Sequence, residues 1–352
     1  MRSAIKNSYL EPLATQAALE PWQRHFAEAV KDPSELLRML QLPDTWLPQA
    51  RKAALVFPLR VPRGFVNRMR TGDPEDPLLR QVLPLGAELE TVPGFGKDPL
   101  QENQATVHPG VLHKYQGRVL MVTTGACAVH CRYCFRRHFP YGDSNPAQGD
   151  WSASLEYLGA NSDVREVILS GGDPLSLPDA RLSALALRLE ALAHLTRLRI
   201  HTRLPVVLPE RVTPALLELL ARGRLRKVIV LHVNPPAEID ASVREALARL
   251  SGTGALLLNQ SVLLRGVNDQ VAVLERLSEE LFSAGVQPYY LHQLDRVAGA
   301  AHFLVDDSQA LALEAELRQR LPGYLVPRLV RERPGASGKI PLTLDVLGDE
   351  PC

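Results

Sequence analysis

Cysteine is scarce in this chain, and most of what there is stands in one place. Among 352 residues there are four cysteines, three of them at Cys127, Cys131 and Cys134. Three clustered thiols exclude a disulfide framework and are typical of a reducing compartment, so we expect a cytoplasmic protein. The fourth, Cys352, is the last residue, and because termini are commonly frayed we do not expect it to be a ligand.

The chain also lacks the features of membrane and nucleic-acid-binding proteins. No apolar run reaches the roughly 18 residues that a membrane span needs, and the polar start at residues 1–7 has no signal-peptide stretch. Lys and Arg together number 40 against 39 Asp and Glu, so no surface built on bulk positive charge is expected. We therefore expect no nucleic-acid or membrane partner, and the length and composition fit an intracellular enzyme.

The spacing of the three clustered cysteines predicts an iron–sulfur cluster. Three residues separate Cys127 from Cys131, and two separate Cys131 from Cys134. Zinc sites need four ligands, usually from two distant Cys-x-x-Cys pairs, whereas cubane clusters take thiolates from a compact loop. Three local thiols leave one iron open to a substrate or cofactor. The alternative is a zinc-bound or incidental cysteine loop.

Hydrophobic periodicity divides the chain near residue 105. The first part is rich in proline and in helical stretches, such as 21–30 and 33–40, each opening with a proline. After it, short β-branched segments alternate with amphipathic ones. The predicted strands are 118–124, 166–170, 198–202, 227–233, 255–263 and 287–291. The predicted helices are 182–193, 214–221, 242–250 and 271–284, with Asp240 and Asp269 as entry caps.

This alternation predicts an α/β fold with a parallel sheet of six β-α units. The pattern itself leaves open whether the sheet is doubly wound or closed into a barrel.

Two further segments carry residues suited to cofactor chemistry. Ser170, Gly171, Gly172 and Asp173 follow the second predicted strand, and two glycines let backbone approach a bound group closely. The alternative is a simple turn. In the loop 333–339 (RPGASGK), Lys339 ends a run of small residues; it is a surface lysine or one that bonds to an aldehyde cofactor.

These motifs resemble the radical S-adenosylmethionine signature, with aromatic Tyr133 before the third cysteine. The chain is further similar to the lysine 2,3-aminomutase family between about 107 and 342. The matching segments are 113–120 (HKYQGRVL), 203–209 (RLPVVLP), 259–269 (NQSVLLRGVND) and 323–327 (GYLVP). Segments 135–141 (FRRHFPY) and 290–303 (YLHQLDRVAGAAHF) resemble the bacterial branch that makes β-lysine for elongation factor P.

The resemblance implies a fold and a domain division. It implies a partial (β/α)6 TIM-like barrel with its chemistry at the C-terminal ends of the strands. The core would be 106–342, preceded by a mainly helical extension at 1–105 and followed by a tail at 343–352. This chain lacks the C-terminal extension of the longer family members, so their zinc site is not expected here.

The resemblance also implies three cofactors. A [4Fe-4S] cluster would be held by the three clustered cysteines, and its open iron would bind S-adenosylmethionine. Pyridoxal 5'-phosphate would bond to Lys339, with its phosphate near Arg118, and Tyr115, which matches the tyrosine near that arginine in the family, would also contact the cofactor. The other residues that the resemblance assigns to cofactor binding are Tyr133, Ser170, Gly171, Gly172, Asp173 and Gln260.

Charge favours L-lysine as the substrate. A bound lysine presents a carboxylate and a distant ammonium, and burying either unpaired costs several kcal/mol. By resemblance, Arg136 would bind the carboxylate, and Asp295 and Glu332 the ammonium. Longer relatives usually have aspartate at the position of Glu332, so this residue is a departure that could affect turnover or specificity. The resemblance implies conversion of (S)-α-lysine to (R)-β-lysine, a downstream elongation factor P lysyl-ligase, and a reducing partner such as flavodoxin or ferredoxin.

Three alternatives stay open on the sequence. One is a related aminomutase that acts on glutamate or another amino acid, which Asp295 and Glu332 disfavour. Another is a radical enzyme without pyridoxal phosphate. The last is a metal-binding regulator without catalytic activity, which zinc in place of iron would favour.

Overall fold

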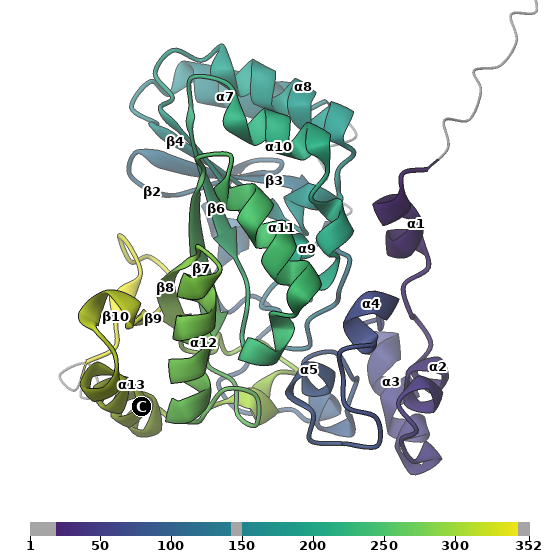
Figure 1. Ribbon diagram of the computed structural model, residues 1–352. Coiled ribbons are helices and arrows are strands. Elements are labelled where there is room, and N and C mark those ends of the chain that lie inside the picture. Colours follow the sequence, from purple (N-terminus) through teal and green to yellow (C-terminus); the bar gives the residue numbers. More distant parts are fainter. Residues whose placement is uncertain (1–18, 142–149, 344–352) are drawn as a thin grey trace, which may run out of the picture.

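The structure is a computed structural model that describes residues 19–141 and 150–343 (Figure 1). The predicted C-terminal tail beyond residue 343, with Cys352, lies outside the described residues. One sheet forms the centre of the chain, and helices of the middle and C-terminal parts cover it. Among the described residues, no helix combines the length and apolarity needed to cross a membrane.

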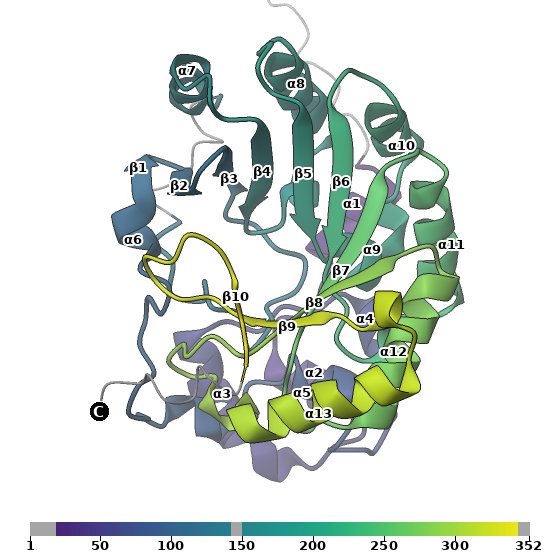
Figure 2. The same ribbon diagram turned by 90° about the vertical axis from the view of Figure 1, so that its left-hand side faces the viewer.

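The sheet has ten strands in sequence order, and seven of them, β3 to β9, pair in parallel. β1, β2 and β10 pair antiparallel at the two ends of this series. In the part of the chain that the structure describes, the two end strands do not pair with each other, so the curved sheet is a partial barrel (Figure 2). The strands are β1 (Thr106–His108), β2 (Val111–Tyr115), β3 (Arg118–Thr124), β4 (Glu166–Gly171), β5 (Arg197–Thr202), β6 (Arg226–Leu231), β7 (Leu256–Val262), β8 (Gln287–His292), β9 (Arg328–Arg331) and β10 (Ile340–Pro341).

The predicted barrel core is confirmed. All six predicted strands and all four predicted barrel helices are present, with bounds that differ by a few residues at most. Strand β4 shows why the pattern was informative: Val167, Ile168 and Leu169 are buried in succession, as parallel strands covered on both faces are. The short N-terminal helices after Pro21 and Pro33 are also present, each with its proline in the first turn.

Helices α10, α11 and α12 follow one another along one side of the sheet (Figure 2). The Asp240 carboxylate accepts from the backbone N–H of Val243 and caps α11, as predicted. The predicted cap Asp269 is wrong, because α12 begins at Val271 and the Asp269 carboxylate instead accepts from Gly266 N in the preceding turn. The helices are α1 (Pro21–Ala27), α2 (Pro33–Met39), α3 (Leu47–Val56), α4 (Arg63–Val66), α5 (Pro77–Arg80), α6 (Glu102–Ala105), α7 (Ser152–Ala160), α8 (Asp179–Glu190), α9 (Leu204–Val207), α10 (Pro214–Ala221), α11 (Ala241–Ser251), α12 (Val271–Ser283) and α13 (Asp307–Arg320).

The sequence analysis missed helices α7 and α13 and the seventh parallel strand, β9. Helix α13 carries the signals that could have predicted it. The Asp306 carboxylate caps its N-terminus, and Ala310, Leu313 and Leu317 form a buried stripe at helical spacing. Strand β9 has only four residues, too few for a period to be recognised.

Residues 19–105 pack against the loops that leave the C-terminal ends of the strands. Arg68 donates to the carbonyls of Val206 and Glu238, which follow β5 and β6 in the chain. The Arg211 guanidinium lies 4.6 Å from the ring centroid of Trp22. Buried side chains of this segment, Phe65 and Leu79 among them, belong to the same hydrophobic cluster as the barrel core. The segment therefore helps to shape the end of the barrel where the loops gather.

Candidate active site

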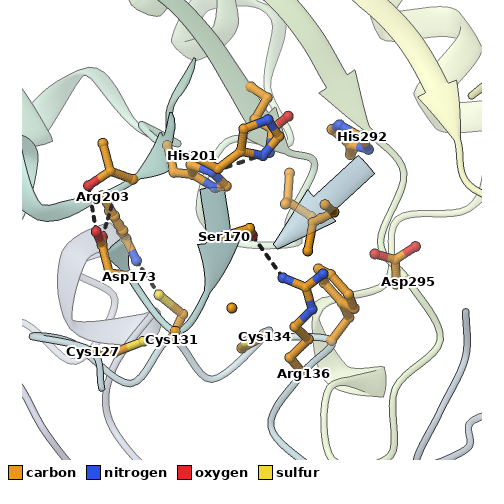
Figure 3. A pocket seen from close by; sticks show the side chains of 18 of the residues that line it. Cys127, Cys131, Cys134, Arg136, Ser170, Asp173, His201, Arg203, His292 and Asp295 are labelled. Carbon is orange, nitrogen blue, oxygen red and sulfur yellow. Dashed lines mark hydrogen bonds between the residues drawn. The ribbon is translucent and has the colours of Figure 1, made fainter. Parts of the chain in front are cut away.

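A cavity of about 400 Å³ lies at the C-terminal ends of the strands. Every site residue predicted from the sequence lines it: Tyr115, Arg118, Cys127, Cys131, Tyr133, Cys134, Arg136, Ser170, Gly171, Gly172, Asp173, Gln260, Asp295, Glu332 and Lys339. The fold thus gathers into one space residues as far apart in the chain as Tyr115 and Lys339. Figure 3 shows the three cysteines on one side of this space, with Arg136 next to Cys134 and Asp295 farther away, beyond Arg136.

The cysteine loop follows β3, and all three of its cysteines line the cavity. A turn in which Cys134 N donates to Cys131 O, at 3.0 Å, holds the last two together. Burial raises the pKa of Cys127, and it raises the pKa of Cys134 to about 11, so metal binding must displace their protons. No three His, Cys, Asp or Glu side chains among the described residues converge on one metal ion. A cubane cluster fits such separated thiols, because each binds a different iron.

Residues of the N-terminal segment 19–105 accept hydrogen bonds from the cysteine loop and from the residues that follow it. The buried Glu88 carboxylate accepts from Arg132 Nε at 2.8 Å and from Arg137 Nη2 at 2.6 Å. Arg132 also donates to the Phe57 carbonyl, and His130 N donates to the carbonyl of Arg60. Because two loop arginines share one buried carboxylate, the loop between the cysteines is held in a single shape.

Gly171 and Gly172 allow the loop after β4 to touch the cysteine loop. A Cβ on Gly172 would lie 2.4 Å from Ala126 O, and Gly171 has a φ of +114°, where a Cβ would lie 2.8 Å from Thr124 O. The backbone N–H of Gly172 donates to Thr124 O at 2.7 Å. The glycines are therefore required for contact between two loops, whatever they also do for a cofactor.

Asp173 has its carboxylate fully engaged within the protein. It accepts from the Thr202 hydroxyl and from the backbone N–H groups of Leu175, Arg203 and Leu204. Burial raises its pKa, although these hydrogen bonds oppose the rise. The carboxylate thus fixes the loop after β5, and its predicted contact with a cofactor stays a prediction.

Five side chains of alternating charge run through the cavity. Arg136 forms two hydrogen bonds with Glu102, at 2.7 and 2.9 Å, and a further one with the Ser170 hydroxyl. Lys114 Nζ lies 3.4 Å from Glu102 and 3.6 Å from Glu332, and Lys339 Nζ lies 3.0 Å from Glu332. Each of these buried charges therefore has a partner of opposite sign, and the five side chains together carry one net positive charge.

The two acidic residues predicted to bind an ammonium group have very different proton affinities. Burial and the nearby Glu332 carboxylate raise the pKa of Asp295 to about 7, while Lys339 opposes the rise. Burial also acts to raise the pKa of Glu332, but Lys339 and Lys114 lower it to about 2. Near neutral pH, Glu332 is therefore ionised and Asp295 carries a proton about half of the time.

The other predicted cofactor residues lie around Lys339 and the cysteine loop. The Arg118 guanidinium lies 4.5 Å from the Tyr115 ring centroid, and none of the described residues accepts a hydrogen bond from it. Tyr115 donates to Glu332 at 3.1 Å. Tyr133 accepts from Asn234 at 2.7 Å, while Gln260 lies 3.2 Å from His232 Nε2. An unpaired guanidinium in a cavity suits an anionic group such as phosphate.

Sequence analysis missed several polar residues of the cavity: Glu102, Lys114, His201, Arg203, His232 and His292. The three histidines and Arg203 lie at or just after the ends of β5, β6 and β8, so strand-end position was a usable signal. Glu102 precedes the barrel, and nothing in the sequence pattern marks it.

The histidines of the cavity are neutral. Burial lowers the pKa of His201 and His292, and that of His232 to about 3. His201 Nε2 and His292 Nε2 are buried without a hydrogen-bond partner among the described residues. Buried polar atoms are rarely left unpaired, so these two nitrogens fit a cavity that holds a polar ligand.

Comparison with known proteins supports the class that this fold and site define. Residues 121–277, which include the cysteine loop, match the model of the Radical SAM superfamily. Membership of this superfamily implies a [4Fe-4S] cluster and S-adenosylmethionine, and the three separated thiols fit that cluster. A solved structure, SuiB of Streptococcus suis bound to S-adenosylmethionine, is 16% identical, with a TM-score of 0.46 over 64% of this chain and 52% of that one. That structural likeness is too weak to support an argument.

The relatives define the family more narrowly. The chain is 50% identical over 328 residues to L-lysine 2,3-aminomutase of Escherichia coli, covering 93% of this chain and 96% of that protein. It is 46% identical to the enzyme of the same name from Haemophilus influenzae, covering 90% and 94%. The likeness to that of Clostridium subterminale is 36%, covering 79% and 67%. The chain belongs to the lysine 2,3-aminomutase family of radical SAM isomerases.

Proposed function

We propose that this protein is a pyridoxal-phosphate-dependent L-lysine 2,3-aminomutase that converts (S)-α-lysine to (R)-β-lysine. The observation that carries the proposal is the alternating chain of charges from Arg136 to Lys339 in the same cavity as the three cysteines. It offers a cation for a carboxylate and carboxylates for an ammonium, which are the two charged ends of lysine.

The residues present fit each cofactor. Cys127, Cys131 and Cys134 would hold the cluster, and the loop of Ser170 to Asp173 and the residues Tyr133 and Gln260 would surround S-adenosylmethionine. Lys339 would bond to pyridoxal phosphate, with Arg118 at its phosphate and Tyr115 beside its ring. When bound, these groups supply a carbon radical and an aldehyde that conjugates the migrating nitrogen.

Arg136 is suited to the α-carboxylate of the substrate. A guanidinium has five N–H donors, and Glu102 and Ser170 occupy three of them here. Two donors therefore remain, one on each terminal nitrogen. Glu102 also holds the guanidinium in place, so the substrate carboxylate meets donors that are already oriented.

Glu332 and Asp295 are suited to the ε-ammonium. Glu332 now holds the ammonium of Lys339, which would leave that position when its nitrogen bonds to the cofactor. The ε-ammonium of lysine would then restore the lost charge pair. Burial and Glu332 raise the pKa of Tyr115, so its hydroxyl stays protonated and continues to donate to Glu332.

The surroundings are suited to radical chemistry. Because His201, His232 and His292 are neutral, they add polar contacts to the cavity without adding charge. Much of the remaining lining is apolar, including Leu112, Ile168 and Leu294. A lining of this kind limits the water that would quench a radical.

We further propose that the β-lysine supplies modification of elongation factor P through a lysyl-ligase, with flavodoxin or ferredoxin as reductant. The supporting observation is the similarity of segments 135–141 and 290–303 to that branch of the family.

Glu332→Gln tests the substrate assignment. We expect kcat/KM for lysine to fall by about 100-fold or more, because removing one carboxylate leaves the ε-ammonium with Asp295 alone. The measurement is β-lysine formation by mass-resolved chromatography, with glutamate and norleucine as comparison substrates. Glu190→Gln is a matched control, since Glu190 pairs with Lys227 outside the cavity. Rearrangement of glutamate but not lysine by the native protein would show that the substrate is wrong.

The pKa of Asp295 predicts a pH dependence. Below about pH 7 this carboxyl is protonated and the pocket loses one of its two negative charges. We therefore expect KM for lysine to rise by about tenfold as pH falls from 8 to 6, with the apparent pKa near 7. In Asp295→Asn, KM should be high at every pH and nearly flat. A native KM that does not change over this range would contradict the role of Asp295.

A further inference from the structure

Arg203 makes a contact that the reaction described above does not use. Its Nη1 atom donates to Cys131 Sγ at 2.7 Å, and its side chain is only 6% exposed (Figure 3). The neighbouring Nε has no hydrogen-bond partner among the described residues. A buried cation thus lies directly against one of the three sulfurs expected to hold the cluster.

The fold fixes the backbone of Arg203. The Asp173 carboxylate accepts from the backbone N–H groups of Arg203 and Leu204, at 2.7 and 3.1 Å, at the start of α9. Through Asp173, the loop after β4 therefore sets the direction in which the Arg203 side chain leaves the loop after β5.

The end of the guanidinium is fixed as well. Its Nη2 donates to Gln81 Oε1 at 2.7 Å and to Glu238 Oε1 at 2.9 Å, and the guanidinium carbon lies 5.7 and 5.8 Å from the ring centroids of Phe65 and Tyr133. Gln81 and Phe65 come from the N-terminal segment, so this segment contributes to the surroundings of the cysteine loop. An arginine restrained from both ends cannot easily turn away from the sulfur.

A charged donor at a ligand sulfur changes the energy of the cluster. Reduction adds one negative charge to the cluster and its thiolates, and a nearby cation with an N–H aimed at sulfur stabilises that charge. The effect is larger in a buried site, where water screens little.

We propose that Arg203 is a positioning residue that raises the reduction potential of the cluster through its hydrogen bond to Cys131 Sγ. The inference rests on the cluster part of the proposed function and is independent of which amino acid is the substrate. Glu238 has the opposite effect, because its carboxylate partly cancels the positive charge of Arg203.

The test is a redox titration of reconstituted protein, without S-adenosylmethionine or lysine, followed by EPR of the reduced cluster. In Arg203→Gln we expect the equilibrium constant for one-electron reduction to fall about tenfold, which corresponds to about 59 mV. Arg203→Lys, which keeps the charge but loses the rigid fork, should give a smaller fall. A potential equal to that of the native protein, in Arg203→Gln with an intact cluster signal, would overturn the proposal.

Glu238→Gln gives a second and opposite test. Its Oε1 can still accept from Arg203 and Gln81, and the new amide nitrogen takes the place of Oε2, which has no partner among the described residues. We expect the equilibrium constant for reduction to rise about threefold. If Arg203→Gln does not retain a cluster, Glu238→Gln is the deciding variant. An unchanged or lower reduction potential in Glu238→Gln refutes the proposal. A purely structural role for Arg203 predicts no such opposed shifts. Absence of lysine turnover in the native protein, with these shifts present, would count against the proposed substrate alone.

Discussion

Lys339→Ala is expected to lose the absorbance of bound pyridoxal phosphate and at least about 1,000-fold of its rearrangement activity. Lys339 Nζ lies in the cavity beside Glu332 and 5.6 Å from the ring centroid of Tyr290. The other lysine that lines the cavity, Lys114, is held between two carboxylates. Among the described residues that line the cavity, no second lysine is therefore free to replace Lys339.

Two control variants sharpen this prediction. Lys52→Ala removes an exposed lysine on α3 and should leave both absorbance and activity unchanged. Lys114→Met should weaken cofactor and substrate binding without removing the absorbance band. Retention of the band in Lys339→Ala together with its loss in Lys114→Met would show that the cofactor bonds to Lys114 and not to Lys339.

Cys131→Ala is expected to abolish the cluster and, with it, every later step. Three thiolates bind three different irons, so removal of one leaves two irons open and the cubane unstable. We expect iron content to fall below about half of the native value and deoxyadenosine formation to fall by about 1,000-fold or more. Iron and sulfide analysis after anaerobic reconstitution, with EPR after dithionite reduction, measures both effects.

The fourth cysteine provides the control for this experiment. Cys352→Ser should keep native iron content, because we expect three ligands and not four. If Cys352→Ser loses the cluster as Cys131→Ala does, the site has four protein ligands and no open iron. Binding of S-adenosylmethionine to the cluster would then have no basis.

The barrel was predictable because its strands and helices carry strong local patterns. β4 has three successive apolar residues at 167–169, α10 opens with Thr213 and Pro214, and α11 begins after the cap Asp240, so the chemistry of each element matches its place. Helix α13 was not predicted, although it carries the same kinds of signal, an N-terminal cap and a buried apolar stripe. The short strand β9 belongs to the sheet because it pairs with β8. A pairing between distant segments cannot be recognised from the local sequence pattern of either one.

The site residues that could be predicted from the sequence are those whose type and spacing rarely occur for another reason. Clustered cysteines and a lysine at the end of a small-residue loop point to chemistry even when no contact is known. Glu102 and Lys114 were not predictable, because a lone acid or base is usually solvated and only the fold brings these two beside Arg136 and Glu332.

Asp173 has a structural role that its motif does not indicate. Its position after the glycine pair predicts a cofactor contact, which stays a prediction, and its carboxylate also accepts four hydrogen bonds from other residues of the protein. The motif indicates where the residue lies, but the partners of its side chain within the protein come from the fold.

The central claim is that one cavity joins a radical cofactor to the amino group of lysine. The most direct measurement supplies reconstituted protein, kept free of oxygen, with dithionite, S-adenosylmethionine, pyridoxal phosphate and lysine labelled with ¹⁵N at its α-nitrogen. The account predicts β-lysine that carries the label on its β-nitrogen, formed in excess over the S-adenosylmethionine consumed. Deoxyadenosine released without β-lysine, or the label lost as ammonia, would contradict it.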